Sequence, residues 1–252
     1  MKVVCVIPAR LHSKRFPRKV LSILQGKPLL QWIWEKALAF DLFDEVVFAV
    51  DAQETAQLVD SFFGKFLMTP QSCTSGTDRL IFLMKTKQLS GEIWINWQGD
   101  EPLICRTMMT KLLKDVHNKH PTIWSLRRKL TSEREIIDPN VVKVVTDHDG
   151  HALYFSRSPI PYFLEKKGEY YKHIGIYAYN AKALKKIKGC RFSCLEEAER
   201  LEQLRFLENG LRITLREVED DTVNIDHPKD LVLASNVLSR EEQSTEISMP
   251  SI

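Results

Sequence analysis

The chain has 252 residues, a length that fits one α/β domain and buries enough apolar surface to fold without disulfides or a structural metal. It carries 36 basic and 33 acidic side chains, and the net charge of +3 is too small to indicate nucleic acid or an anionic membrane as a partner. Its five cysteines lack zinc-like spacing, and no apolar run is long enough to span a membrane. These features predict a soluble, cytoplasmic protein with reduced thiols.

Short apolar runs alternate with segments of helical period as far as residue 97. Continuous apolar strands separated by helices predict a parallel sheet covered on both faces, with the carboxyl ends of its strands on one ligand-binding edge. The expected strands are 3–7, 46–50, 66–68 and 93–97, and the expected helices are 28–40, 53–63 and 77–89.

After residue 121 the pattern changes to strands with few helices between them. The sequence DHDG at 147–150 predicts a hairpin turn, and Asn209-Gly210 predicts the end of a helix. Pro228 suits the first turn of the last helix, and the polar segment 239–252 is expected to be disordered. The expected strands are 122–130, 141–147, 151–157, 172–180 and 212–219, and the expected helices are 194–210 and 227–238.

The segment IPARLHSKRFPRK at 7–19 follows the first expected strand directly. It contains neither the GxGxxG nor the GxxxxGK[ST] pattern of common phosphate-binding loops. Instead it has Ser13 as a hydroxyl donor and a dense group of basic side chains: Arg10, Lys14, Arg15, Arg18 and Lys19. Such a group at the carboxyl edge of a sheet can neutralise a triphosphate, although a solvated basic surface loop would also explain it.

Two aspartates are candidate metal ligands. Asp100, in WQGDEP, follows the fourth expected strand, where a carboxylate can bind Mg²⁺ and Gly99 permits close backbone approach. Turn chemistry alone also explains this Gly-Asp pair. Asp226, in VNIDHPKDL, is either the N-cap of the last helix or a second ligand paired with Asp100. Sequence spacing does not show that pairing.

The remaining polar candidates are scattered. Ser75 and Gly76, in SGTDRL, precede a helix whose N-terminus suits an anion or a base edge, although a plain N-cap fits equally well. A second group combines a cation, an imidazole, a phenol, a carboxylate and an amide, as a pocket for a polyhydroxylated acid would: Arg157, His173, Tyr177, Glu202 and Gln203. Each of these residues taken singly also fits an ordinary, satisfied polar side chain.

In combination these motifs resemble the 3-deoxy-manno-octulosonate cytidylyltransferases. The resemblance covers about residues 3–235 and rests on the first basic motif followed in order by SGTDR, QGDEP, ALYFSRSPIP, KHIGIYAY, LEQLR and the ID-x-P-x-DL pattern. It implies a nucleotide-diphospho-sugar transferase fold of the α/β class: a mostly parallel, Rossmann-like sheet with helices on both faces and a smaller β-rich region. A single domain over residues 1–238 would dimerise through about 120–205.

The resemblance also implies an activity and its residues. The enzyme would transfer CMP from CTP to the anomeric hydroxyl of 3-deoxy-D-manno-octulosonic acid (KDO), releasing pyrophosphate, for lipopolysaccharide biosynthesis. The nucleotide site would contain Pro8, Ala9, Arg10, Ser13, Arg15, Lys19, Ser75, Gly76 and Arg79. The sugar site would contain Gln98, Arg157, His173, Tyr177, Glu202 and Gln203. The catalytic residues would be Arg15, Lys19, Asp100 and Asp226, of which the two aspartates would bind Mg²⁺.

The chain departs from the family pattern at 18–20, at Asp78 and beside Asp226, where His227 and Lys229 stand. These departures remove no expected ligand, but they leave the preferred sugar open, and an 8-amino-8-deoxy analogue of KDO could be the substrate instead. A sialic acid, or a neutral sugar phosphate with UTP, would be the substrate of a related enzyme, but the LEQLR and KHIGIYAY motifs argue against both. A protein of a different class, a non-catalytic nucleotide-binding regulator, is disfavoured because both expected metal ligands are retained.

Overall fold

The computed structural model describes residues 1–12, 16–117, 119–165 and 168–247. Its central sheet has the strand order β11-β7-β10-β6-β1-β4-β5. Four strands from the first half of the chain lie in parallel: β1 (Val3–Ala9), β4 (Glu45–Val50), β5 (Phe66–Met68) and β6 (Ile93–Asn96). Their crossover helices are α1 (Leu29–Phe40), α2 (Gln53–Ser61) and α3 (Gly76–Lys85). The predicted parallel sheet with intervening helices is confirmed.

The second half of the chain extends this sheet on the β6 side. β10 (Tyr170–Asn180) runs antiparallel to both β6 and β7 (Thr122–Leu130), and β11 (Arg212–Val218) lies parallel to β7 at the edge. β8 (Lys143–Thr146) and β9 (Ala152–Ser156) form the predicted hairpin, which joins the sheet through β10. The smaller elements are the 3-10 turn η1 (Lys19–Leu21), β2 (Ile23–Leu24), β3 (Lys27–Pro28), α4 (Arg106–Leu113), α5 (Glu133–Ile137) and α6 (Ala181–Ile187).

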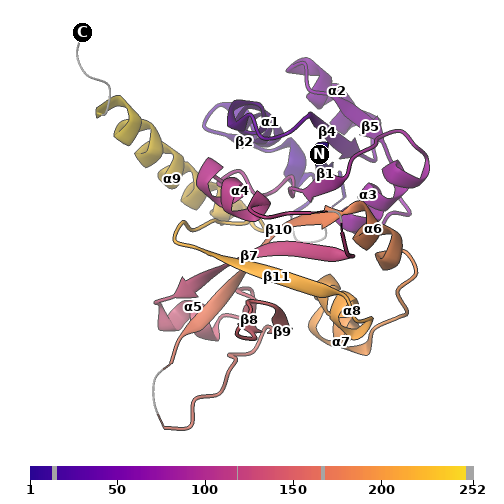
Figure 1. Cartoon of the computed structure of the whole chain (residues 1–252). Coiled ribbons are helices and arrows are strands. Elements are labelled where there is room, and N and C mark those ends of the chain that lie inside the picture. The colour runs from indigo at the N-terminus through magenta and orange to yellow at the C-terminus, as the bar shows by residue number, and fades with distance from the viewer. Residues whose placement is uncertain (13–15, 118, 166–167, 248–252) are drawn as a thin grey trace.

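Helices cover both faces of the sheet because the strands carry apolar side chains on both faces. In β1, Cys5 and Ile7 pack with α1, α2 and α4, whereas Val4 and Val6 pack with α3, α6 and the helix over residues 202–208. Figure 1 shows α4 on one face of the β7–β11 part of the sheet, with α7 (Cys194–Glu199) and α8 (Glu202–Glu208) on the other. The two buried clusters hold the strand ends at fixed positions.

The helix predicted at 194–210 is wrong in one respect, because it is two helices. α7 ends at Arg200, whose φ of 56° places it in the left-handed region, and α8 starts two residues later. A non-glycine residue in that region interrupts the helical hydrogen bonds. The predicted stop at Gly210 is confirmed by its φ of 69°.

The last helix is longer than predicted. α9 (Pro228–Ile247) begins at the predicted proline but includes residues 239–247 of the segment expected to be disordered. Residues 248–252 lie outside the described part of the chain. Among the described residues, no helix combines the length and the apolar character needed to cross a membrane.

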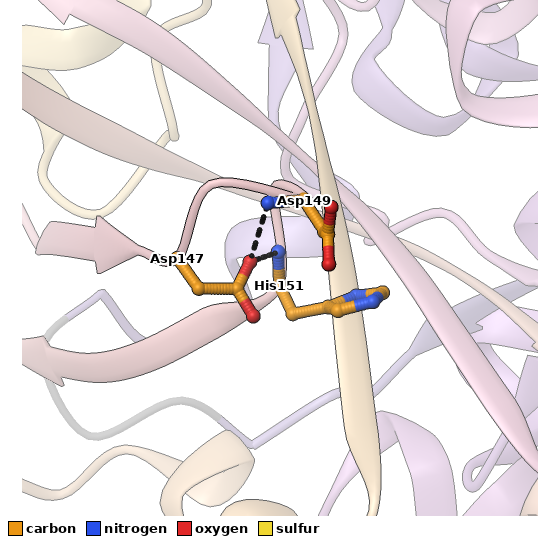
Figure 2. A group of neighbouring side chains, drawn as sticks. All are labelled: Asp147, Asp149 and His151. Carbon is orange, nitrogen blue, oxygen red and sulfur yellow. Dashed lines mark hydrogen bonds between the residues drawn. The ribbon is translucent and has the colours of Figure 1, made fainter.

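The β8–β9 turn gathers Asp147, Asp149 and His151, whose potential ligand atoms lie within 4.8 Å of one another (Figure 2). The turn itself accounts for this cluster. Asp147 Oδ1 accepts hydrogen bonds from the backbone N–H groups of Asp149 at 3.0 Å and His151 at 2.8 Å. An aspartate that satisfies its own turn in this way is ordinary hairpin chemistry.

Candidate active site

The carboxyl ends of β1 and β6 come together at one edge of the sheet. The backbone N–H of Gly99 donates to the carbonyl oxygen of Pro8 at 3.2 Å, and a Cβ on Gly99 would lie only 2.8 Å from that oxygen. Glycine is therefore required for this close approach. It brings the turn after β6, which carries Asp100, against the end of β1, where Pro8 and Ala9 lead into the basic segment.

The two aspartates predicted to pair do meet, at Lys19. The Lys19 ammonium lies 2.5 Å from Asp100 Oδ2 and 3.3 Å from Asp226 Oδ1. The two carboxylate oxygens therefore both contact the same ammonium. Lys19 is buried, and both carboxylates are partly exposed. Two carboxylates from distant parts of the sequence thus converge on one positive charge.

The segment that carries Asp226 is fixed to the Asp100 turn by the backbone, because the N–H of Ile225 donates to the carbonyl of Asp100 at 2.9 Å. Asp230, in the first turn of α9, also holds this segment. Its Oδ2 accepts the backbone N–H groups of Asp226 at 2.9 Å and His227 at 2.7 Å. This arrangement leaves the Asp226 carboxylate directed at Lys19.

The basic segment after β1 is only partly described, because Ser13, Lys14 and Arg15 lie outside the described residues. Arg10 is exposed, and its guanidinium donates to the carbonyl of Thr74, which joins this segment to the loop before α3. Arg18 pairs with Glu54 on α2. Of the basic side chains in this segment that are described, Lys19 is the one directed into the carboxylate pair.

The loop before α3 has the capping role considered for it. Ser75 is the N-cap of α3: its hydroxyl oxygen accepts the N–H of Asp78 at 3.0 Å, and the Asp78 carboxylate accepts the N–H of Ser75. The same helix end faces the site, since a Cβ on Gly76 would lie 2.9–3.1 Å from the side chains of Asn96 and Gln98. Gly76 thus lets the helix approach the end of β6 closely.

Arg79 is not placed for direct contact with a nucleotide. Its side chain is fully buried, and its guanidinium forms an ion pair with Asp51 Oδ2 at 2.8 Å and donates to the hydroxyl of Thr69. Asp51 Oδ1 in turn accepts the backbone N–H of Leu11 at 3.0 Å. Arg79 therefore holds Asp51 in place, and Asp51 in turn holds the backbone of the basic segment at Leu11.

A cavity of about 470 Å³ opens beside the carboxylate pair and includes Asp226 in its wall. Three predicted sugar ligands line it: His173 and Tyr177 from β10, and Gln203 from α8. His173 Nε2 lies 2.9 Å from the hydroxyl of Ser125, and burial lowers the pKa of His173 to about 3, so its imidazole is neutral. Burial raises the pKa of the Tyr177 phenol, which stays protonated.

Gln98, Glu202 and Arg157 are not among the described residues that line this cavity. Gln98 donates to Asn96 Oδ1 at 3.0 Å, close to Gly76, and so lies beside the N-terminus of α3. Glu202 accepts hydrogen bonds from the Thr77 hydroxyl at 2.9 Å and from Arg205 at 2.9 Å, and burial raises its pKa.

The expected cation for the acid, Arg157, is already engaged by the protein. Its Nε donates to the carbonyl of Glu199 at 2.7 Å, and its Nη1 donates to the carbonyl of Pro139 at 2.8 Å. It therefore supports the segment 138–142, part of which lines the cavity.

Sequence reasoning missed two residues at this site. Lys172 lines the cavity, with its ammonium 3.0 Å from Asp221 Oδ1, and Glu101 lies fully buried directly after Asp100. The position of Lys172 next to His173 gave no signal, because successive side chains of a strand point to opposite faces of the sheet. Nothing in the sequence distinguished Glu101 from a turn residue.

Comparison with known proteins identifies the class of this fold as nucleotidyl-transferring enzymes. The cytidylyltransferase family model matches residues 4–213, and the chain belongs to this family. Its similarity extends to 3-deoxy-manno-octulosonate cytidylyltransferase of Thermodesulfovibrio yellowstonii, with 44% identity over 95% of this chain and 99% of the relative.

Solved structures agree with this assignment. The CMP:2-keto-3-deoxy-manno-octonic acid synthetase complexed with CTP matches with a TM-score of 0.89 and 39% identity, covering 96% of this chain and 100% of the other. The inositol-1-phosphate CTP transferase of T. maritima matches with a TM-score of 0.67 and 14% identity over 94% of each chain. The second similarity concerns the fold alone.

Proposed function

We propose that this protein transfers CMP from CTP to the anomeric hydroxyl of KDO, releasing pyrophosphate, as an activating step for lipopolysaccharide biosynthesis in the cytoplasm. One observation carries the proposal: Asp100 and Asp226 converge on the Lys19 ammonium at the edge of the sheet, beside a cavity of sugar size. The relatives named above and the CTP-bound structural neighbour support the choice of nucleotide and acid.

The reaction is a direct displacement at phosphorus. The anomeric oxygen of the acid forms a bond to the α-phosphorus of CTP, the bond from that phosphorus to the bridging oxygen breaks, and pyrophosphate leaves with the electron pair. The hydroxyl proton is lost to solvent. A displacement of this kind needs no nucleophilic side chain, so the protein acts by positioning and by neutralising charge. Lys19 is placed to stabilise the negative charge that gathers on the leaving group.

The residues around Lys19 fit Mg²⁺. Two partly exposed carboxylates already share one cationic group, and hard carboxylate oxygens are the ligands that Mg²⁺ prefers when it also binds phosphates. Asp100 and Asp226 would hold the ion. When bound, it would supply charge neutralisation at the phosphate and lower the pKa of the attacking hydroxyl. The chain itself contributes the two carboxylates and keeps them together through the Ile225–Asp100 backbone hydrogen bond.

The two substrates would bind on opposite sides of this carboxylate pair. We place the nucleotide near Arg10, Ser75 and Gly76, where the end of β1 meets the N-terminus of α3. We place the acid sugar in the cavity along His173 and Tyr177, whose neutral rings can hydrogen-bond hydroxyl groups. The α-phosphate and the anomeric hydroxyl would then meet beside Asp100.

Pyrophosphate release tests the proposed reaction. We expect the purified chain to release pyrophosphate when supplied with CTP, Mg²⁺ and KDO, and to show little release with UTP. Parallel reactions with 8-amino-8-deoxy-KDO and a sialic acid would rank the acids by kcat/KM. Higher kcat/KM with another acid would reassign the substrate, and no release with any acid would favour a non-catalytic nucleotide-binding protein.

We also propose that the chain forms a homodimer through the β-rich region. Several large apolar side chains in this region are strongly exposed: Ile137 at 70%, Leu153 at 60%, Tyr162 at 84% and Leu164 at 82%. Their removal from water favours association. A second copy of the chain is the partner that the family resemblance implies.

The oligomeric state of a double variant tests this dimer. Tyr162→Ser combined with Leu164→Glu is expected to convert a dimer into a monomer in light scattering coupled to size-exclusion chromatography. Phe63→Ser is the matched control, because Phe63 is 92% exposed but lies outside this region, after α2. A wild-type monomer, or a double variant that remains dimeric, would contradict the proposed interface.

A further inference from the structure

The carboxyl group of Glu101 is buried, which is energetically unfavourable for an ionisable group. Its side chain is inaccessible to solvent, and among the described residues neither carboxylate oxygen has a hydrogen-bond partner of good geometry; the Asn224 side chain acts on the carboxyl only through a weaker contact. A buried polar group left in this state destabilises a fold, so native proteins contain few of them, and each calls for an explanation. Burial and the neighbouring Asp100 raise the pKa of Glu101 to about 8, which reflects the same unfavourable position.

The backbone holds this carboxyl in place. The N–H of Glu101 donates to the carbonyl of Gln98 at 3.1 Å, and the indole of Trp97 donates to the carbonyl of Glu101 at 2.9 Å. The side chain is consequently directed from the Asp100 turn towards β10. A Cβ on Gly175 would lie 3.2 Å from Glu101 Oε1.

The neighbours of this carboxyl belong to the wall of the acid-sugar cavity. Gly175 lies on β10 between His173 and Tyr177, at the point where the β10–β7 register shifts. The Lys172 ammonium and the Asn224 side chain act on the Glu101 carboxyl and favour its ionised form, and both residues line the cavity. Glu101 therefore lies behind the part of the cavity wall where β10 meets the segment that leads to Asp226.

We propose that Glu101 is a positioning residue for the acid-sugar half of the site, that it holds Lys172, Gly175 and Asn224 in their places, and that its unsatisfied carboxyl is retained for this purpose. The inference rests on the proposed function. It differs from a structural role in one measurable way: a purely structural residue stabilises the fold, whereas Glu101 destabilises it. Neither nearby lysine depends on Glu101 alone, because Lys172 pairs with Asp221 and Lys19 pairs with Asp100 and Asp226.

The test combines thermal unfolding with separate KM values for the two substrates. Glu101→Met keeps the side-chain length and removes the unsatisfied oxygens, so we expect its Tm to rise by about 2–6 °C. We expect KM for the acid to rise about tenfold or more, with KM for CTP unchanged within about twofold, because only the acid side of the wall shifts. Glu101→Gln should give the same KM split with a smaller change in Tm.

Two further variants make the test specific. Gly175→Ala directs a methyl group at Glu101 Oε1 and should reproduce the rise in KM for the acid. Thr55→Val is the matched control, because Thr55 is also fully buried with an unpartnered oxygen among the described residues but lies on α2. Its Tm should rise, and both KM values should stay at the wild-type level.

Three results would overturn the inference. A lower Tm with parallel loss of both substrates would make Glu101 a structural residue. An unchanged KM for the acid in Glu101→Met would remove its positioning role, and an equal rise in KM for CTP would remove its assignment to the acid side. These outcomes differ from failure of the proposed function itself, which would appear as absence of turnover with KDO in the wild-type protein.

Discussion

Asp100→Asn is expected to lower kcat about a thousand-fold or more while leaving the protein folded, and Asp226→Asn should do the same. The substitution removes one negative charge and changes almost no volume. Each carboxylate is about a quarter exposed, so an amide at either position is not left in a dry core. Lys19 retains one carboxylate in each variant, which keeps the buried ammonium paired. The lost activity would then reflect weaker cation binding and not a collapsed site.

Steady-state pyrophosphate release and circular dichroism check this prediction together. Asp149→Asn serves as the control, because Asp149 is exposed on the β8–β9 turn, and it should retain wild-type kcat and Tm. Raising the Mg²⁺ concentration should partly restore kcat in the Asp226 variant if the residue binds the ion. Near-normal turnover in either variant without added metal would remove that residue from the catalytic pair.

Arg79→Met is expected to lower the free energy of unfolding by about 3–5 kcal/mol, because it leaves the buried Asp51 carboxylate without its cation. Asp51 is only 6% exposed and cannot be rescued by water. The loss should extend to the nucleotide side, since Asp51 also accepts the backbone N–H of Leu11 in the basic segment. We therefore expect a raised KM for CTP in whatever fraction remains folded.

Urea unfolding of single and double variants measures this effect. Arg79→Met combined with Asp51→Asn should recover part of the lost stability, because the unpaired charge is removed along with its partner. Arg191→Met, at an exposed position, should change the free energy of unfolding by less than about 0.5 kcal/mol. If Arg79→Met unfolds at the wild-type urea concentration but fails to bind CTP, Arg79 contacts the nucleotide directly after all.

The strands could be predicted closely from the sequence because a continuous apolar run indicates a strand that is buried on both faces of a sheet. The predicted strands 66–68 and 122–130 coincide with β5 and β7, and the other predicted strands differ by a few residues at their ends. The helix break at Arg200 could not be predicted, because no glycine or proline marks it. In its left-handed conformation Arg200 donates its backbone N–H to the carbonyl of Glu196, and the residues after it, Leu201 and Gln203, line the cavity.

The sequence predicted which residue types form the candidate site, but it did not predict the direction in which their side chains point. The carboxyl-edge argument placed Asp100 and the basic segment on the same side of the sheet, but the meeting with Asp226 depends on a backbone hydrogen bond that spacing does not reveal. Arg79 illustrates the opposite case. Its guanidinium, in the SGTDRL motif, points into the core, because it pairs with the buried carboxylate of Asp51 directly after β4.

The Lys19 ammonium occupies the position between Asp100 and Asp226 where a metal ion would bind. Lys19 offsets one of the two negative charges before any ligand arrives, which reduces the repulsion between the carboxylates of Asp100 and Asp226. If Asp100 and Asp226 were to hold a divalent ion, Lys19 would give up this position, and its ammonium would then be available to the phosphates of a nucleotide. Ion and nucleotide should therefore each tighten the binding of the other, by the same factor in both directions.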